Sequence, residues 1–286
     1  MISLIICSRK HNVSKELEEN IKTTIGVEYE LIIIDNSNNK YSIFQAYNEG
    51  VKRSKYPYLC FMHEDILYHT INWGEKIIKH LDNYKVGVIG VAGGHYIPNT
   101  PSSWFDSNVV STNIQQSFYQ NGIKQIFCNN QTTYMTDLSI EVVAVDGVWF
   151  CLPKTLFSTI SFDEISFKGF HCYDLDICLQ ARNAGYQVLV ISDILLEHFS
   201  FGSCDIKWVE NTIIFQNKWK HHLPQIAGVE LMTSEMEMID SFVRQKFYLL
   251  KELNKELNAI RHSKAYQLGK FILKPFSIIR NKVNRN

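Results

Sequence analysis

The order of apolar and polar positions over the first 92 residues predicts strands and helices in alternation. Four short apolar runs rich in β-branched residues are typical of buried strands: residues 2–7, 29–34, 58–62 and 86–91. Three amphipathic segments lie between them and predict helices over residues 13–25, 41–54 and 71–83. Because each crossover helix must pack its apolar stripe on the sheet, this βαβαβαβ order predicts a parallel sheet covered by helices.

The pattern changes after residue 92. Residues 93–140 are polar and turn-rich with scattered aromatics, which indicates a long excursion over the sheet. A strand interrupted at Asp146-Gly147 is expected within residues 141–152, a helix over 174–184 and a strand over 187–191. Helical periodicity dominates after Pro224. We therefore expect an α/β body over residues 1–222, divided near residue 92, and a helical extension over residues 223–286.

Composition and charge narrow the class of protein. The 286 residues are 45% hydrophobic and 20% charged, which is typical of a globular chain. The 29 basic and 29 acidic residues balance overall, yet residues 261–286 hold seven Lys or Arg and no acidic residue. The body is therefore mildly acidic, which argues against a nucleic-acid binder, whereas the tail is strongly basic.

The cysteines and the apolar runs indicate in which cellular compartment the protein is expected. Seven cysteines are an odd number, they form no Cys-x-x-Cys pair, and most lie in apolar stretches, as reduced core thiols do. The apolar start at residues 2–7 is too short for a signal sequence, and no run approaches the ~20 apolar residues of a spanning helix. We expect a cytoplasmic protein.

Polar side chains follow three predicted strands. Ligands of open parallel sheets bind outside the carboxyl ends of the strands, and those ends carry Cys7-Ser8-Arg9, Asp35-Asn36 and His63-Glu64-Asp65. Two carboxylates beside an imidazole repel each other unless a cation neutralises them, and oxygen ligands suit Mg²⁺ or Mn²⁺. Taken alone, Asp35 is better explained as a turn residue whose side chain caps its own backbone, although a carboxylate at a strand end could also accept from a base or sugar.

Two later segments also carry candidate chemistry. Asp174 and Asp176 stand at the start of a predicted helix, so one carboxylate can cap the helix while the other serves as a general base. His198 ends a short apolar stretch. It is either a metal or phosphate ligand or a packed, hydrogen-bonded histidine.

Taken in order, these segments resemble the family 2 glycosyltransferases over about residues 1–205. The resemblance lies in the order and spacing of the motifs ISLIICSR, IIIDNS, AYNEG, FMHEDI and YDLDICLQARNAGY, followed by a late histidine. It implies the GT-A fold, a Rossmann-like and mostly parallel sheet, and transfer with inversion. Residues 1–92 would form the nucleotide-binding half and residues 93–222 the acceptor-binding half.

The resemblance also implies donor and cation contacts. Residues 7–9 and Asp35 would line the base pocket, and Asn48 would support the ribose and phosphate side. His63 and Asp65 fall on the two ends of the family's Asp-x-Asp motif, with His63 in place of the first Asp. His63 and Glu64 would contact the nucleotide sugar. Asp65 would bind the divalent cation, Mn²⁺ or Mg²⁺. His198 matches a histidine that completes the cation or diphosphate contacts in some members.

For the reaction and the acceptor, Tyr173-Asp174 falls where the family commonly has Glu-Asp, so Asp174 matches the general base. Asp176 takes that role if the register is read differently. The acceptor is expected between residues 93–140 and 146–150, near Asp146, Trp149 and Asp176, and Trp104, Tyr134 and Trp149 are candidates to stack on a sugar. Trp149 is equally well explained as a core residue.

The implied activity is metal-assisted transfer from a nucleotide sugar, expected to be a UDP sugar, to a hydroxyl of a glycan or lipid-linked acceptor, as in bacterial surface polysaccharide synthesis. A non-catalytic nucleotide-sugar or glycan-binding module is the alternative, and the departures at His63 and Tyr173 favour it. A nucleotidyltransferase would need a glycine-rich loop after the first strand, and residues 7–12 contain no glycine.

The basic tail predicts a partner. Residues 242–257 carry an apolar stripe, and residues 265–280 are basic and amphipathic, as in helices that lie on an anionic membrane surface. Packing on the body or on a second subunit is the other interpretation. The lack of acidic residues favours the inner membrane surface, so we expect a peripheral membrane protein.

Overall fold

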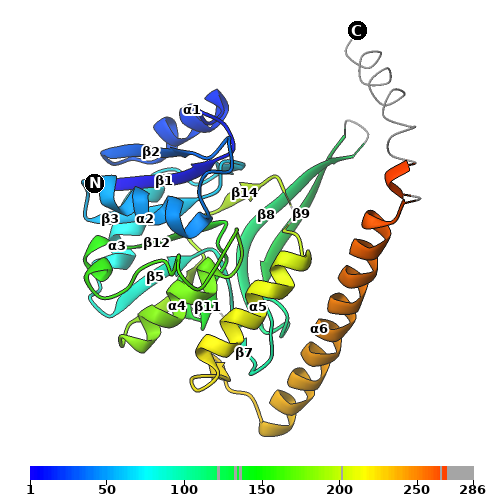
Figure 1. Cartoon of the computed structure of the whole chain (residues 1–286). Coiled ribbons are helices and arrows are strands. Elements are labelled where there is room, and N and C mark those ends of the chain that lie inside the picture. Colours follow the sequence, from blue (N-terminus) through cyan, green and yellow to red (C-terminus); the bar gives the residue numbers. More distant parts are fainter. Residues whose placement is uncertain (121–122, 132–133, 135–136, 201, 265, 269–286) are drawn as a thin grey trace.

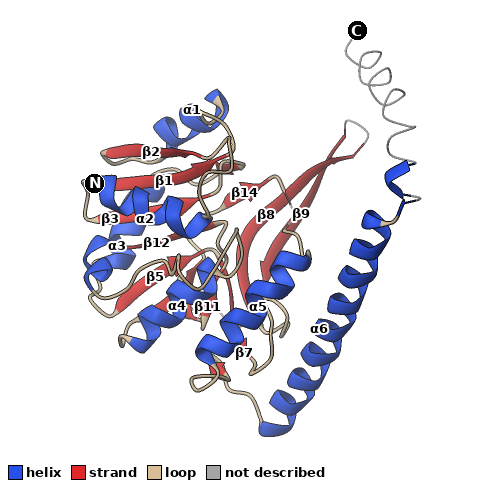
Figure 2. Cartoon of the chain, viewed as in Figure 1, coloured by secondary structure: helices blue, strands red, loops and turns tan. Residues whose placement is uncertain are grey.

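The central layer of the computed structural model is a seven-stranded sheet, shown in Figures 1 and 2. The structure describes residues 1–268 apart from 121–122, 132–133, 135–136, 201 and 265. The strand order is β10-β13-β5-β12-β3-β1-β2. The bounds are β1 (Ile2–Ser8), β2 (Tyr29–Asp35), β3 (Tyr58–Met62), β5 (Val86–Gly90), β10 (Ser139–Glu141), β12 (Trp149–Pro153) and β13 (Gln187–Ile191).

The sheet is mostly parallel, as predicted. Strand β1 runs parallel to both β2 and β3, and β13 runs parallel to β5. Strand β12 enters between β3 and β5 in the antiparallel sense, and β10 lies antiparallel to β13 at the edge. The predicted interruption at Asp146-Gly147 separates β12 from the short strand β11 (Ala144–Val145).

Helices cover both faces of this sheet. They are α1 (Lys15–Thr24), α2 (Ile43–Arg53), α3 (Trp73–Leu81) and α4 (Tyr173–Asn183). Successive side chains of β1 point to opposite faces of the sheet and so belong to two separate parts of the core. Ile5 packs with Phe44 of α2 on one face. Leu4 packs with Leu17 of α1 and Trp73 of α3 on the other face. The predicted helices therefore lie where their apolar stripes require.

A second sheet replaces the irregular excursion expected over residues 93–140. Its order is β11-β6-β8-β14-β4, with β9 paired to β8, and its further strands are β4 (Ile66–Tyr68), β6 (Ala92–Gly94), β8 (Val110–Gln120), β9 (Ile123–Gln131) and β14 (Leu196–His198). The expectation was wrong because β8 buries polar residues. The side-chain amide of Asn113, for example, donates to the carbonyls of Ser192 and Ile194 at 2.9 Å each. Short pieces β7 (Tyr96–Ile97), β15 (Gln225–Ile226) and the 3₁₀ helix η1 (Lys154–Ser158) complete the body.

Two helices end the described chain: α5 (Ile206–Trp219), which the sequence pattern did not predict, and α6 (Thr233–His262). Helix α6 lies along the body, where Phe247 packs with Trp208 of α5 and Lys246 pairs with buried Asp106 at 2.6 Å (Figure 1). Among the described residues, no helix combines the length and the apolar character that crossing a membrane requires.

Asp176 joins α4 to α5 inside the body. Its side chain is 1% exposed, and its carboxylate contacts Lys218 Nζ at 2.7 Å and accepts from Trp219 Nε1 at 2.8 Å. Gln180 Nε2 also donates to it at 2.7 Å. The expectation that Asp176 contacts an acceptor, or serves as the base, is therefore wrong: this carboxylate is buried among its own partners.

We predict that Asp176→Ala lowers the free energy of unfolding by about 2–4 kcal/mol, because it removes a buried, ion-paired carboxylate and leaves the Trp219 Nε1–H without its acceptor. The measurement is urea unfolding followed by circular dichroism. Glu49→Ala is the matched control, because Glu49 forms an i,i+4 pair with Arg53 on the surface of α2 and its loss should cost about 0.5 kcal/mol or less. Equal losses for the two variants would contradict the prediction.

Candidate functional site

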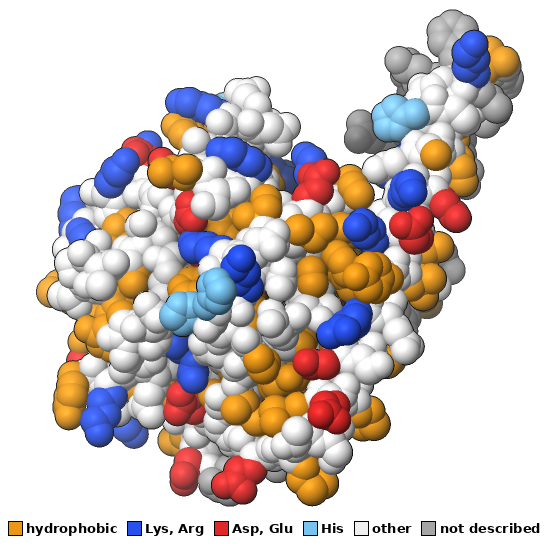
Figure 3. All heavy atoms as spheres, turned by 60° about the horizontal axis from the view of Figure 1, so that its bottom comes forward, with side chains coloured by type: hydrophobic (Ala, Val, Ile, Leu, Met, Phe, Trp, Pro, Cys, Tyr) orange, Lys and Arg blue, Asp and Glu red, His pale blue; other side chains and the backbone are white. Residues whose placement is uncertain are grey.

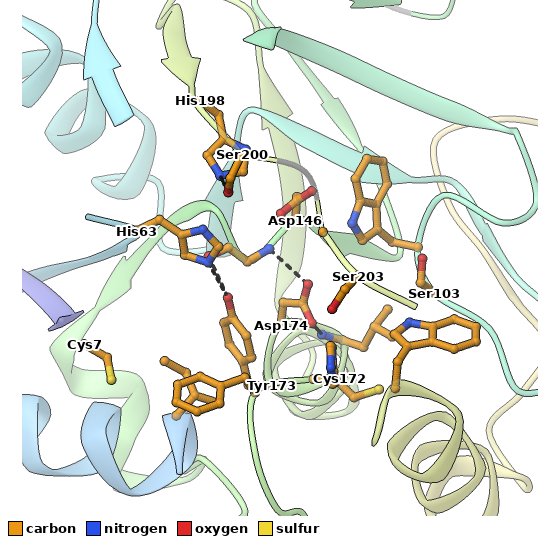
Figure 4. Close-up of a pocket in the computed structure, with 18 of the residues that line it drawn as sticks. Cys7, His63, Ser103, Asp146, Cys172, Tyr173, Asp174, His198, Ser200 and Ser203 are labelled. Atoms are coloured by element: carbon orange, nitrogen blue, oxygen red, sulfur yellow. Dashed lines mark hydrogen bonds between the residues drawn. The ribbon is translucent and has the colours of Figure 1, made fainter. Parts of the chain in front are cut away.

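One cleft of about 780 Å³ opens at the carboxyl ends of β1 and β3 and above the start of α4. Sequence-predicted residues from distant segments line it together, as Figure 4 shows for several of them: Cys7, Arg9, His63, Glu64, Asp65, Trp104, Asp146, Asp174 and His198. Parallel strands end at one edge of the sheet, which explains how separate loops reach one cleft.

Glu64 organises the loop that follows β1. Its carboxylate accepts a hydrogen bond from the hydroxyl of Ser8, which is buried, and it lies 3.3 Å from Nε of Arg9. The Ser8 hydroxyl also accepts from the backbone N–H of Lys10 at 3.0 Å. Ser8 thus contacts both Glu64 and the backbone of the loop, while the exposed Arg9 side chain lies at the rim of the cleft.

Two residues expected on the donor side lie elsewhere. Asp35 pairs with His11 at 2.5 Å and accepts from the Ser37 N–H at 3.0 Å, so it is the turn residue of the alternative interpretation. Asn48 donates to the Phe162 carbonyl at 2.8 Å and faces a separate, smaller cavity. From the loop after β2, the described residues that line the main cleft are Asn36 and Asn39.

His63, Asp65 and His198 form a cluster with one ligand atom of each residue within 4.8 Å of the others. Asp65 Oδ1 lies 3.8 Å from His63 Nδ1 and 3.5 Å from His198 Nε2. These separations are too long for good hydrogen bonds, and two atoms about 2.1 Å from one ion lie at most about 4.2 Å apart. Both separations from Asp65 lie within this limit, and two imidazoles with a carboxylate are donors that divalent ions such as Mn²⁺ accept.

The protonation of this cluster suits a cation. Burial opposes ionisation of Asp65, but its interactions with His198, Ser200 and His63 outweigh burial and hold the pKa of Asp65 well below its usual range. Burial, with His198 nearby, lowers the pKa of His63. Asp65 is thus a carboxylate and His63 a neutral imidazole at neutral pH. Gln116 and Ser200 contact the His198 ring at 3.3 and 3.2 Å.

Asp174 lies in the first turn of α4 and faces the same cleft. Its two oxygens accept from the backbone N–H groups of Gly147 at 3.0 Å and Leu175 at 2.9 Å (Figure 4). Burial, together with the neighbouring charge of Asp146, raises the pKa of Asp174 to about 7. A carboxyl that titrates near neutral pH is matched to the work of a general base.

Aromatic side chains form the remaining wall of the cleft. Trp104 lies there, as predicted, together with four residues that the sequence pattern did not single out: Phe105, Phe170, His171 and Trp208. Trp208 belongs to the unpredicted helix α5, and no local signal marks it. The acceptor contact expected of Trp149 is wrong, because Trp149 is fully buried and donates to the Tyr68 hydroxyl at 2.9 Å. Tyr134 lies beside His95, outside the residues that line the cleft.

A family model described as "Glycosyltransferase like family" matches residues 3–222. The chain belongs to this glycosyltransferase-like family. No curated protein matches this glycosyltransferase-like protein. The crystal structure of GalNAc-T7 with UDP, GalNAc and Mn²⁺ matches with a TM-score of 0.50 and 11% identity, over 92% of this chain and 58% of that one. This likeness supports the GT-A fold.

Two further solved structures are similar at lower scores. S. aureus TarS (residues 1–349) matches with a TM-score of 0.49 and 12% identity, over 93% of this chain and 76% of that one. A197 from STIV matches with a TM-score of 0.40 and 12% identity, over 70% and 86%. At these identities the likeness of this glycosyltransferase-like protein to solved structures concerns the fold alone.

We predict that Asp146→Asn lowers the pKa of Asp174, because it removes a like charge that disfavours the Asp174 carboxylate. The measurement is a pH titration of the aspartate side-chain carboxyl signals by ¹³C NMR, with Asp174→Asn used for assignment. Exposed Asp137 lies outside the cleft lining, so Asp137→Asn is the control and should leave the titration unchanged. An Asp174 midpoint that does not move in Asp146→Asn would show that the two carboxyls do not interact.

Proposed function

We propose that this protein transfers a hexose from a nucleotide sugar, expected to be a UDP sugar, to a hydroxyl of a glycan or lipid-linked acceptor with inversion. One observation carries the proposal: the cation-compatible cluster of His63, Asp65 and His198 and the neutral-range carboxyl Asp174 line the same cleft. A group that departs with a diphosphate and a hydroxyl that loses a proton can therefore meet at one place. Bacterial surface polysaccharide synthesis is the process that this activity would serve.

The donor would lie on the side of residues 1–92. The loop after β1, with Cys7 and Arg9, and Glu64 after β3 line that side of the cleft, and Arg9 offers positive charge to a diphosphate. When bound by His63, Asp65 and His198, a divalent cation, Mn²⁺ or Mg²⁺, supplies charge neutralisation for the leaving group. The two halves of the body, residues 1–92 and 93–222, each contribute to the cluster.

Asp174 would act as the general base. Its carboxylate form accepts the proton of the acceptor hydroxyl while that oxygen attacks the anomeric carbon from the face opposite the diphosphate, so the configuration inverts. The N–H groups of Gly147 and Leu175 hold the carboxylate in place. Because the base works only when deprotonated, transfer should rise with pH through about 7 and level off above it.

The acceptor would lie against the aromatic wall of Trp104, Phe105, Phe170 and Trp208, on the side of residues 93–222. Aromatic faces pack against the apolar faces of sugars while the hydroxyls keep their polar contacts. Asp146 lies beside Asp174 at the edge of this wall and is positioned to accept from a second acceptor hydroxyl.

We predict that Asp174→Asn abolishes transfer, by at least about 10²-fold, while donor binding persists, because the amide cannot accept the proton but fills the same space. Transfer and hydrolysis are measured over UDP, GDP and dTDP sugars with Mn²⁺, and binding by thermal shift. Asp137→Asn is the charge-matched control. Near-wild-type turnover in Asp174→Asn would remove Asp174 from the mechanism, and binding without turnover in the wild type would favour the non-catalytic module.

We further propose that the protein lies in the cytoplasm, peripheral to the membrane, through the extension 223–286. Along α6, Phe242, Leu249, Leu253 and Leu257 are exposed, and Figure 3 shows hydrophobic side chains among charged ones along the projecting helix. The basic segment follows directly, although residues 265 and 269–280 of the amphipathic stretch lie outside the described residues. Basic charge and apolar area on one segment suit an anionic lipid surface.

We predict that the full chain floats with anionic vesicles of phosphatidylglycerol and that a chain truncated after Arg261 does not, because the truncation removes six of the seven basic residues of the tail. Lys270→Gln/Lys274→Gln/Arg280→Gln is the matched control, since it keeps the length and the apolar positions. It should float less than the wild type, and the difference should shrink at high salt, where the attraction to anionic lipid is screened. Equal recovery of all three proteins would reject membrane binding through the basic tail.

A further inference from the structure

The hydroxyl of Tyr173 joins the cation cluster to the loop that holds the base. It donates to the Gly147 carbonyl at 3.0 Å and lies 3.1 Å from His63 Nε2, as Figure 4 shows for the imidazole contact. Tyr173 and His63 are 110 residues apart in the sequence. The proposed roles of the cation cluster and of Asp174 do not by themselves assign a role to this tyrosine hydroxyl.

Counting protons gives the direction of both hydrogen bonds. A tyrosine hydroxyl has one proton, and a carbonyl can only accept, so the proton of Tyr173 goes to Gly147. His63 Nε2 must therefore carry a hydrogen and donate it to the Tyr173 oxygen. The reverse arrangement would remove the tyrosine donor from the Gly147 carbonyl, and a buried carbonyl without its partner is unfavourable.

Packing holds the hydroxyl at this point. The Tyr173 ring is 6% exposed and meets Tyr47 edge-on at 5.5 Å and Phe44 edge-on at 6.4 Å. A Cβ at position 147 would lie 2.3 Å from the Tyr173 hydroxyl oxygen. Position 147 thus needs glycine, and the close approach leaves the hydroxyl little room to move.

We propose that Tyr173 is a positioning residue for the divalent cation. By accepting from His63 Nε2–H, it fixes the ring orientation and the tautomer that leaves the Nδ1 lone pair directed at Asp65, 3.8 Å away. This proposal rests on the cation site of the proposed function. It gives His63 the role of a metal ligand in place of the donor contact expected from the sequence.

Two consequences follow for the chemistry of the site. A site with two imidazole ligands and one carboxylate prefers Mn²⁺, Co²⁺ or Zn²⁺ to Mg²⁺, which favours oxygen ligands. Because Tyr173 directly precedes Asp174 in the first turn of α4, one helix turn positions both a metal ligand and the base. A shift of that turn would change the cation site and the base together.

The test is the affinity for Mn²⁺ in the absence of substrate, measured from the electron paramagnetic resonance signal of free Mn²⁺. Tyr173→Phe should weaken Mn²⁺ binding about 10- to 100-fold, because the loss of a hydrogen-bond partner of a metal-ligating histidine has effects of this size. Tyr96→Phe is the matched control. It also removes a buried tyrosine hydroxyl, one that donates to Asp240 on α6, and it should leave the affinity unchanged.

A double-mutant cycle separates positioning from general structural damage. If Tyr173 acts through His63, Tyr173→Phe should change Mn²⁺ affinity less than about 2-fold in a His63→Ala background. A loss that persists in that background, or no loss in the wild-type background, would overturn the proposal. Wild-type protein that binds no Mn²⁺ would overturn the cation site itself, so the two failures are distinguishable.

The tautomer can also be tested without any change at Tyr173, should that variant not fold. In wild-type protein with ¹⁵N-labelled histidine and no metal, long-range ¹H–¹⁵N spectra distinguish Nε2–H from Nδ1–H, with His63→Asn used for assignment. The proposal requires Nε2–H at His63. A signal from Nδ1–H at this residue would overturn it.

Discussion

The cleft depends on keeping acidic side chains close together while giving them different electrostatic surroundings. Asp65 has two imidazoles beside it, and the net effect is a pKa below its usual range. Asp174 has burial and the charge of Asp146 beside it, and its pKa rises to about 7. At neutral pH one carboxyl is therefore ionised, while the other titrates close to that pH. Carboxyls whose surroundings drive their pKa values apart are the usual basis of separate roles in one site.

Gly147 is the backbone element that connects these surroundings. Its N–H donates to Asp174 and its carbonyl accepts from Tyr173, so a single residue contacts the base and the partner of His63. The turn at residues 146–148 exists because β12 enters the sheet antiparallel, between β3 and β5. That insertion delivers Asp146 and Gly147 to the carboxyl end of β3, where the Val148 carbonyl accepts from the His63 N–H at 2.9 Å. The topology therefore places Asp174 and His63 of the cluster within one hydrogen-bonded unit.

The parts of the fold that the sequence predicts well are those in which local pattern and tertiary packing agree. Strands β1, β3 and β5 are buried on both faces, so their apolar runs are nearly continuous and their ends are easy to find. Strand β8 is not recognisable from the sequence, because several of its buried residues are polar: Ser111, Asn113 and Ser117. Whether such residues lie in a loop or in a strand depends on partners far away in the sequence.

The same distinction explains the candidate site. Residues at strand ends, such as Asp65, could be placed by their position alone, whereas Trp149 and Asp35 could not. Trp149 points into the core because the register of β12 against β3 pairs it with Met62, and no local pattern sets that register. Asp35 stands at a strand end like Asp65, but its carboxylate turns to the backbone of its own loop and to His11. Strand-end position predicts where a residue lies, and only the contacts show which way it faces.

His63 and Tyr173 are the two positions at which the sequence departs from the motifs of the glycosyltransferases that it resembles. Taken separately, each departure favours a protein that binds a nucleotide sugar without turning it over. The structure puts the two side chains in contact at 3.1 Å, with His63 in the cluster that fits a cation and Asp174 retained one residue beyond Tyr173. An imidazole in place of a carboxylate needs a partner for its second nitrogen, and the phenol supplies one. The two departures therefore lie in one contact that keeps His63 within the cluster, so they are compatible with the proposed cation site.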